Sequence, residues 1–312
     1  MDPPIQVREL SKRYNAVLAL NRLTLAVPKG SCVGFLGPNG AGKTTTIKIL
    51  TNLLRPTSGE AYINGQNVQE DPKRALRAVG AVVETPEFYR ELTPREILAY
   101  LGKVRGMSSG DLDRAIAEVI AQVGMKEWTD TRMGKFSKGM VQRIAIGQAL
   151  LHRPDILILD EPSSGLDPRG MAEVRDLILS LRKEGLTIFM SSHLLFEVQA
   201  VCDRVAFVDR GKLVGYDAVE NLAKLRSVKR IDVGHLTPLE GALLERTKAL
   251  PGVRSVETPA PDRTILEFEG DSSAQADLLT HLQELGLRVH SFRETEMALE
   301  RTYMDLVGAS NA

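Results

Sequence analysis

The chain has 312 residues, of which 43% are hydrophobic and 26% are charged, a composition typical of an ordinary globular protein. Its 40 basic and 40 acidic residues cancel, so no net field would attract nucleic acid, and we predict no nucleic-acid partner. No apolar run approaches the roughly 18 residues of a membrane-spanning helix. The start MDPPIQVREL lacks a basic segment followed by an apolar one, so we expect a soluble cytoplasmic chain.

The two cysteines, Cys32 and Cys202, are far apart in the sequence and have no metal-ligand spacing. A disulfide framework is therefore not expected, and a reducing compartment fits. We interpret both residues as small buried side chains.

The first two thirds of the chain alternate between strand-like apolar runs and helical or polar segments. Four runs read as strands: SCVGFLG (31–37), AVVET (81–85), ILILD (156–160) and TIFMSS (187–192). This alternation predicts an α/β fold with a mainly parallel sheet and helices on its faces. The region of about 93–151 has a helical pattern, which begins with Thr93 as an expected helix cap followed by proline. We interpret this region as a helical subdomain.

The last part of the chain, 229–312, has a different pattern and is predicted to be a second, small α+β domain. Its segments read as a strand (229–233), a helix (238–250), two strands (253–258 and 264–269), a helix (272–285), a strand (288–292) and a last helix (296–307). This order matches the split βαβ, ferredoxin-like arrangement. The histidines in it are isolated, and we expect them to be solvated or at the edge of the core. They are His235, His281 and His290.

A glycine-rich loop, GFLGPNGAGKTTT, lies between an apolar strand and a helix expected to begin near Lys43. It fits the phosphate-loop pattern G-x-x-x-x-G-K-[ST], in which glycines let phosphate oxygens approach backbone N–H groups and the helix N-terminus adds positive charge. Lys43 is expected at the β and γ phosphates, and the Thr44 hydroxyl at Mg²⁺. The residues predicted to contact nucleotide here are Gly37, Pro38, Asn39, Gly40, Ala41, Gly42, Lys43, Thr44 and Thr45.

Two neighbouring carboxylates, Asp160 and Glu161, end the apolar strand ILILD. We predict that Asp160 serves the Mg²⁺ site and that Glu161 orients and polarises the attacking water. The alternative is a pair of solvated acids at a strand end. SSGLDP then brings Asp167, and TIFMSSH ends in His193 on the same carboxyl edge of the sheet, where ligands of open α/β sheets bind.

Together these motifs resemble those of the nucleotide-binding subunit of an ATP-binding cassette (ABC) transporter over about residues 5–220. GPNGAGKT resembles the family's Walker A motif, ILILDE its Walker B motif, SSGLD its D-loop, and His193 its switch histidine. FSKGM stands where the signature L-S-G-G-Q is expected, and Tyr14 where an aromatic ring stacks on adenine. The resemblance implies a P-loop ATPase domain over residues 1–220.

The resemblance implies that this chain works together with other subunits. Ser137 and Gly139 are expected to bind the γ-phosphate held by a second ATPase subunit, which we take to be an identical copy. Two subunits would thus complete two composite sites, with ATP and Mg²⁺ as cofactors. The implied partner is a separately encoded membrane permease, which would hold the ATPase at the inner face of the cell membrane. Export is favoured over import, and regulation or added dimer contact is a hypothesis for the tail.

The chain departs from the family pattern at two motifs. Lys138 and Met140 replace residues of the signature, and Glu84 stands at the usual glutamine position, where a carboxylate can also ligate Mg²⁺. Phe88 and Tyr89 follow; contact with the permease and packing against the helical subdomain both remain open for them. Rival interpretations are an ABC ATPase acting on ribosomes or DNA, and a binding module without hydrolysis. An ABC ATPase acting on ribosomes or DNA would usually need two cassettes in tandem or a long coiled-coil insert, and the sequence has neither. A binding module without hydrolysis would be expected to lose Glu161 or His193, and both are present.

Overall fold

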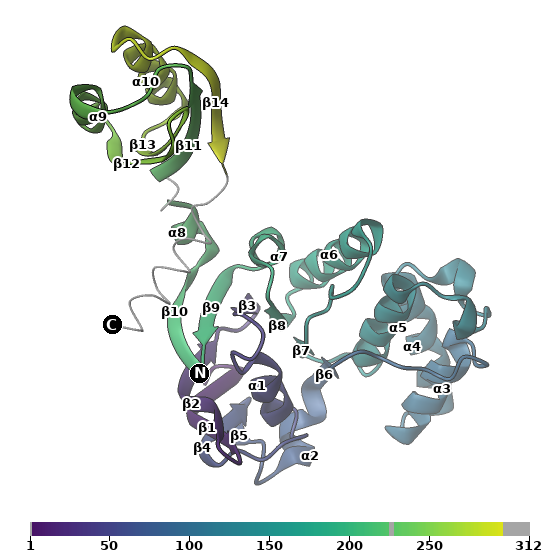
Figure 1. Cartoon of the computed structure of the whole chain (residues 1–312). Helices are drawn as coiled ribbons and strands as arrows, with labels where there is room; N and C mark the ends of the chain where they lie inside the picture. The colour runs from purple at the N-terminus through teal and green to yellow at the C-terminus, as the bar shows by residue number, and fades with distance from the viewer. Residues whose placement is uncertain (1, 225–227, 296–312) are drawn as a thin grey trace. The chain divides into compact units, whose positions relative to one another are not determined.

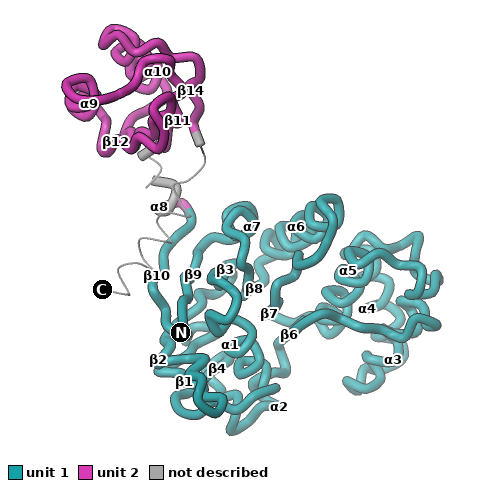
Figure 2. The backbone as a smooth tube through the Cα atoms, viewed as in Figure 1, with its two compact units in different colours: residues 1–219 teal, residues 220–312 magenta. Residues whose placement is uncertain are grey.

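The computed structural model describes residues 2–224 and 228–295, and the chain divides into two compact units (Figures 1 and 2). Unit 1 comprises residues 1–219 and unit 2 comprises residues 220–312.

The central layer of unit 1 is a six-stranded sheet of order β10-β9-β3-β8-β7-β6. Its strands are β3 (Cys32–Leu36), β6 (Val79–Val82), β7 (Ile156–Leu159), β8 (Thr187–Ser192), β9 (Arg204–Asp209) and β10 (Lys212–Ala218). All neighbours pair in parallel except β10, which runs antiparallel to β9. The four predicted strands and their parallel arrangement are thereby confirmed, but the strand predicted over 81–85 spans 79–82 instead, so Glu84 and Thr85 follow it. Strands β3, β7 and β8 are buried throughout, as expected for strands covered on both faces.

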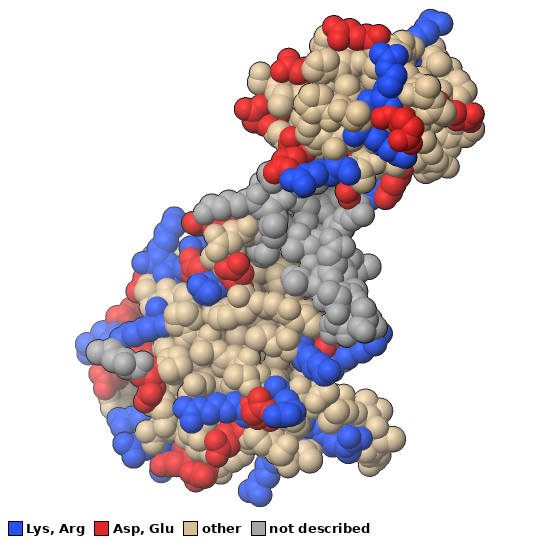
Figure 3. All heavy atoms as spheres, turned by 90° about the vertical axis from the view of Figure 1, so that its left-hand side faces the viewer, with Lys and Arg blue, Asp and Glu red and all other residues tan. Residues whose placement is uncertain are grey.

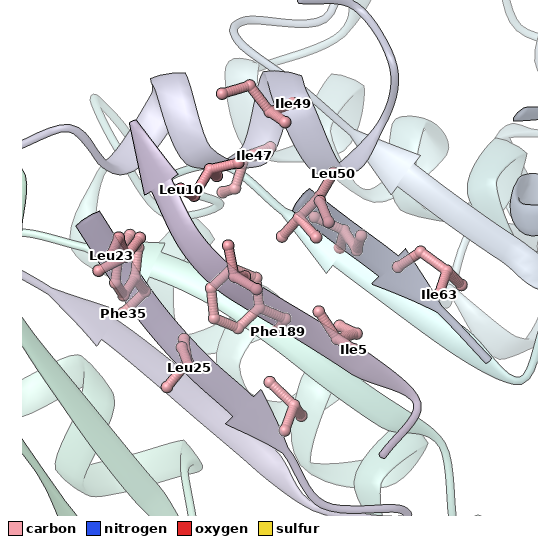
Figure 4. Packing of buried hydrophobic residues seen from close by; sticks show 14 of the residues in the cluster. Ile5, Leu10, Leu23, Leu25, Phe35, Ile47, Ile49, Leu50, Ile63 and Phe189 are labelled. Carbon is pink, nitrogen blue, oxygen red and sulfur yellow. The ribbon is translucent and has the colours of Figure 1, made fainter. Parts of the chain in front are cut away.

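A second sheet in unit 1, not predicted from the sequence, is antiparallel and has the order β2-β1-β4-β5. It is formed by β1 (Ile5–Tyr14), β2 (Val17–Val27), β4 (Ser58–Ile63) and β5 (Gln66–Asn67). Its inner residues share one apolar core with helix α1 (Lys43–Leu50) and with the central sheet. Figure 4 shows Ile47, Ile49 and Leu50 of α1 packed with Ile5 of β1 and Phe189 of β8. This packing fixes the helix that follows the glycine-rich loop.

Other helices of unit 1 include α2 (Pro72–Ala75) and α6 (Pro168–Lys183), which begin with a side-chain cap, and α7 (Leu195–Val201), which does not. The short helix α2 begins after Asp71, and α6 begins after Asp167. The helix α7 packs on β3, where a methyl group at Gly34 would collide with the side chain of Val198.

The helices predicted over about 93–151 are present as α3 (Pro94–Val104), α4 (Ser109–Gln122) and α5 (Lys138–Leu150). Thr93 caps α3 in a full capping box with Glu96, with proline at the first position as expected. Ser108 and Ser137 accept backbone N–H groups at the starts of α4 and α5. Among the described residues, no helix is long and apolar enough to cross a membrane.

Unit 2 contains a four-stranded antiparallel sheet of order β12-β13-β11-β14. Its elements are α8 (Val219–Lys224), β11 (Val228–His235), α9 (Gly241–Lys248), β12 (Val253–Ala260), β13 (Arg263–Glu269), α10 (Ser272–Glu284) and β14 (Val289–Thr295). From β11 onward the order and topology are ferredoxin-like, as predicted. The last predicted helix, 296–307, lies outside the described residues.

One histidine of unit 2 is neither solvated nor at the edge of the core, so the prediction was wrong for it. His235 is fully buried, and its ring nitrogens lie 2.7 Å from the Thr237 carbonyl oxygen and 2.8 Å from the Thr264 hydroxyl. Both ring nitrogens therefore have partners inside the fold, which explains how a polar ring is tolerated there. On the face that Figure 3 shows, basic and acidic side chains are interspersed on both units, as the balanced composition suggests.

Candidate functional site

The glycine-rich loop connects the buried strand β3 to helix α1 at the carboxyl edge of the central sheet. A side chain at Gly37 would collide with the carbonyl oxygen of Val208, so only glycine fits where the loop leaves the strand. Gly40 has a φ of 83° and open space beside it, whereas Gly42 has a φ of 104° and closely approaches Leu20. No side chain caps α1 at Gly42, which leaves its first N–H groups for an anion.

Lys43 is the first residue of α1 and is almost completely buried. Its Nζ donates to the carbonyl oxygens of Gly37 at 2.8 Å and Pro38 at 3.2 Å. The same Nζ lies 3.2 Å from Oε1 of Glu161. The Lys43 side chain thus joins the loop to the end of β7 through contacts with both.

Asp160 follows β7 and is buried beside the loop. Its Oδ1 accepts a hydrogen bond from the Thr44 hydroxyl at 3.2 Å and another from the Ser191 hydroxyl at 2.7 Å. Ser191 also accepts a hydrogen bond from the backbone N–H of Glu161 at 2.9 Å. Ser191 was not singled out in the sequence, although it belongs to the run TIFMSS. This run gave no signal that its hydroxyl joins the Asp160 carboxylate to the backbone of Glu161.

Glu161 lies between a lysine and a histidine. Its Oε2 is 3.0 Å from Nδ1 of His193, while its Oε1 faces Lys43. Its backbone has a φ of 44°, an uncommon value for a residue with a side chain, which turns the chain away from the direction of β7. The structure therefore brings together residues that follow three adjacent strands, β3, β7 and β8: Lys43, Thr44, Asp160, Glu161 and His193.

Ser137, Gly139 and Asp167 form a separate group at the starts of α5 and α6. The Ser137 hydroxyl is exposed and accepts from the N–H of Met140 at 3.3 Å, and Asp167 accepts from the N–H of Gly170 at 2.9 Å. A Cβ at Gly139 would lie 3.1 Å from Cα of Gly170, so these two helix starts pack closely. The hydrogen bonds that the structure gives Ser137 and Asp167 are with their own helices.

Glu84 and Tyr14 lie on the approach to the site. The Glu84 carboxylate forms an ion pair with Lys48 of α1, and its backbone has a φ of 61°. A hydrogen bond from Lys48 to Glu84 is the main reason why the pKa of Lys48 is raised. The Tyr14 ring is partly exposed at the end of β1, with the Lys12 Nζ 5.3 Å from its centroid. The Tyr89 side chain is largely exposed, so it is not buried against the helices that follow it.

The chain is similar to known proteins over most of its length. Residues 20–164 match the family described as ABC transporter. The bacitracin transport ATP-binding protein BcrA of Bacillus licheniformis is 45% identical over 225 residues, which make up 72% of this chain and 72% of that protein. The chain belongs to the family of ABC transporter ATP-binding proteins.

Further relatives of this ABC protein match nearly its whole length. The linearmycin resistance ATP-binding protein LnrL of Bacillus subtilis (strain 168) is 30% identical over 310 residues, or 97% of this chain and 98% of that protein. A solved structure of the ATP-binding subunit of an ABC transporter is 30% identical, has a TM-score of 0.62, and covers 70% of this chain and 92% of its own. The predicted family, the P-loop fold and ATPase activity are thereby confirmed: the chain is the ATP-binding subunit of an ABC transporter.

The site of this ABC subunit fits Mg²⁺ together with ATP. Among the described residues, no three His, Cys, Asp or Glu side chains cluster so as to hold a metal by themselves. Mg²⁺ keeps waters and takes phosphate oxygens alongside one or two protein ligands. The Thr44 hydroxyl beside Asp160 supplies such ligands, next to the uncapped helix start that an anion requires.

The two cysteines of the ABC subunit lie outside this site, and the structure adds a contact that their separation in sequence conceals. Cys32 and Cys202 are both free and buried, as expected, and their sulfur atoms are 3.5 Å apart. The pKa of the Cys202 thiol is raised, first because of its hydrogen bond with Cys32 and then because of burial.

Proposed function

We propose that two copies of this subunit bind two ATP molecules between them and hydrolyse them to drive export through a separate membrane permease. In each site, the loop 37–45 would hold the triphosphate of one copy, and Ser137 and Gly139 of the other copy would contact its γ-phosphate. Asp167 would lie at the junction, and Tyr14 would stack on adenine. The exposure of Ser137 and the uncapped start of α1 support this sharing of each nucleotide site between two copies.

The observation that carries the hydrolysis proposal is the position of Glu161. One oxygen faces Lys43 and the other faces His193, so the carboxylate is held at the phosphate end of the loop. There it would accept the proton of a water that attacks the γ-phosphate. Lys43 would stabilise charge on the β and γ phosphates, and His193 would contact the γ-phosphate while orienting Glu161.

Metal binding is assigned to residues on both sides of the phosphate loop. Thr44 and Glu84 would ligate Mg²⁺, and Asp160 would hold the metal's water shell. When bound, Mg²⁺ neutralises the charge that develops between the β and γ phosphates. The hydrogen bonds of Asp160 to Thr44 and Ser191 support its part, because they fix the carboxylate before the metal arrives.

The partner proposal follows from the relatives. Two relatives are a bacitracin transport ATP-binding protein and a linearmycin resistance ATP-binding protein. They suggest that the cargo of this subunit's permease is an antibiotic-like compound and that it is transported outward. A separate permease would then hold the subunit at the inner face of the cell membrane. The exposed ring of Tyr89, five residues after Glu84, supports permease contact for this loop. Unit 2 is proposed to be an accessory domain, since its buried His235 is fully hydrogen-bonded within the fold.

The test is Glu161→Gln in the full-length chain. It removes the general base but keeps size and hydrogen bonding, so turnover should fall roughly 100-fold or more while ATP binding persists. ATP-dependent dimers should accumulate and be visible by light scattering. Glu127→Gln, which changes an exposed carboxylate of the helical subdomain, is the matched control. Near-normal turnover in Glu161→Gln would remove Glu161 from the proposed role.

A further inference from the structure

Lys48 brings a second positive charge to the phosphate loop, and none of the motifs accounts for it. It lies four residues after Thr44 on α1, and residues with this spacing share one face of a helix. Thr44 contacts Asp160 on that face, and Lys48 pairs with Glu84. Lys48 therefore links α1, which carries the proposed ligand Thr44, to the other proposed ligand, Glu84.

The position of Glu84 makes this pairing consequential. Its side chain is 61% exposed, whereas that of Lys48 is 30% exposed, so the lysine is the better anchored partner. With a φ of 61°, the Glu84 backbone adopts a left-handed conformation that a residue with a side chain rarely takes without a contact to hold it. The ion pair with Lys48 is such a contact, and it fixes where the loop after β6 presents its carboxylate.

We propose that Lys48 is a positioning residue for the metal: its ammonium group holds Glu84 while no metal is bound and releases it when Mg²⁺ enters with ATP. This inference rests on the proposed function, because it takes Glu84 as a ligand. A carboxylate at this position adds a negative charge beside a triphosphate, where a glutamine would add none. Lys48 compensates for that charge in the metal-free chain, and Mg²⁺ does so in the loaded chain.

The proposal has a measurable consequence for metal affinity. Lysine and metal compete for one carboxylate, so the apparent metal dissociation constant equals the intrinsic one multiplied by one plus the equilibrium constant of the Lys48–Glu84 pair. An exposed ion pair of ordinary strength corresponds to roughly a twofold to sixfold reduction in metal affinity. Removing Lys48 should therefore tighten metal binding by that factor, provided that Glu84 is present.

The experiment is a titration with Mn²⁺, a paramagnetic substitute for Mg²⁺, of full-length protein saturated with adenylyl imidodiphosphate. Free Mn²⁺ is read by electron paramagnetic resonance, so no turnover is needed. The variants are Lys48→Met, Glu84→Gln and the two combined. Lys48→Arg keeps the charge and should remain close to wild type. Lys103→Met removes an exposed lysine of α3 and is the matched control for loss of charge.

The expected result is that Lys48→Met lowers the Mn²⁺ dissociation constant twofold to sixfold. In the Glu84→Gln background, the same substitution should change the logarithm of that constant by at most half as much. Equal tightening in both backgrounds, no change, or weakening in Lys48→Met would each overturn the proposal, the first because it reveals only general repulsion between cations. Failure of the proposed function looks different: the wild-type protein would then bind no Mn²⁺ together with the nucleotide. Thermal unfolding of every variant identifies any loss of fold before the constants are compared.

Discussion

Acidification should destabilise unit 1 through a histidine outside the nucleotide site. His152 follows α5, and its Nε2 donates to the Val79 carbonyl oxygen at 3.1 Å. Its Nδ1 is buried without a hydrogen-bond partner in the structure. Burial, together with the nearby charge of Arg105, lowers the pKa of His152 to about 4, although the hydrogen bond to Val79 opposes this shift. The folded chain thus keeps this ring neutral at pH values where the unfolded chain protonates it.

The sign and size of the effect follow from proton linkage. Because the folded pKa lies below the unfolded value of about 6.5, the unfolded chain binds more protons between these two values. The contribution of His152 to stability is complete above about pH 6.5 and is lost as the pH falls towards 4. At pH 5 the loss amounts to about 2 kcal/mol of the free energy of unfolding.

Urea unfolding at pH 7.5 and pH 5.0 measures this loss. Trp128 is the chain's single tryptophan and lies in unit 1, so its fluorescence reports this unit. The variant His152→Gln keeps an N–H donor for Val79 but does not titrate, and other titrating groups affect both proteins alike. The wild-type protein should lose about 2 kcal/mol more than the variant between the two pH values. Equal losses would show that His152 is not held neutral by the fold.

Three further predictions concern other residues. Ser137→Arg should abolish hydrolysis while ATP binding to the monomer, measured by equilibrium dialysis, stays near wild type; equal loss of both would contradict a composite site. Gly37→Ala should lower the free energy of unfolding by about 2 kcal/mol or more because its methyl group meets a backbone carbonyl, whereas Gly40→Ala faces open space and should cost about 1 kcal/mol for its left-handed backbone. In the native chain Cys32 and Cys202 should not react with a thiol reagent, and both should react in urea; a native-state reaction would disprove their burial.

The sequence predicted those parts of the fold that local patterns determine. Continuous apolar runs marked the buried parallel strands, and the cap at Thr93 marked the start of α3. The glycine spacing of the phosphate loop likewise reflects a local need, because the backbone at Gly37 leaves no room for a side chain. In contrast, the first two strands were missed: β1 and β2 pair with several register shifts, and their half-buried residues give no clean alternation.

Contacts between distant segments were beyond a reading of one sequence. Nothing near Ser191 indicates that its hydroxyl joins Asp160 to the backbone of Glu161, since that arrangement depends on β7 and β8 being neighbours in the sheet. The same holds for the contact of Cys32 with Cys202 and for the pairing of Lys48 with a carboxylate 36 residues later. A pattern can show which residue types end each strand, but only the strand order shows which of them meet.

The strand order also explains why the phosphate-loop side of the proposed site is assembled in a single chain, whereas the Ser137 side is not joined to it. β3, β8 and β7 are adjacent and parallel, so the residues that follow them reach one edge of the sheet and assemble there without a partner. Ser137 begins a helix of the helical subdomain, and its hydroxyl is satisfied only by its own helix among the hydrogen bonds of the described chain. An anion bound at that helix start must therefore come from elsewhere, and a nucleotide held by a second copy would bring one. The Ser137→Arg test separates these halves, since it alters the second without touching the residues that hold Glu161.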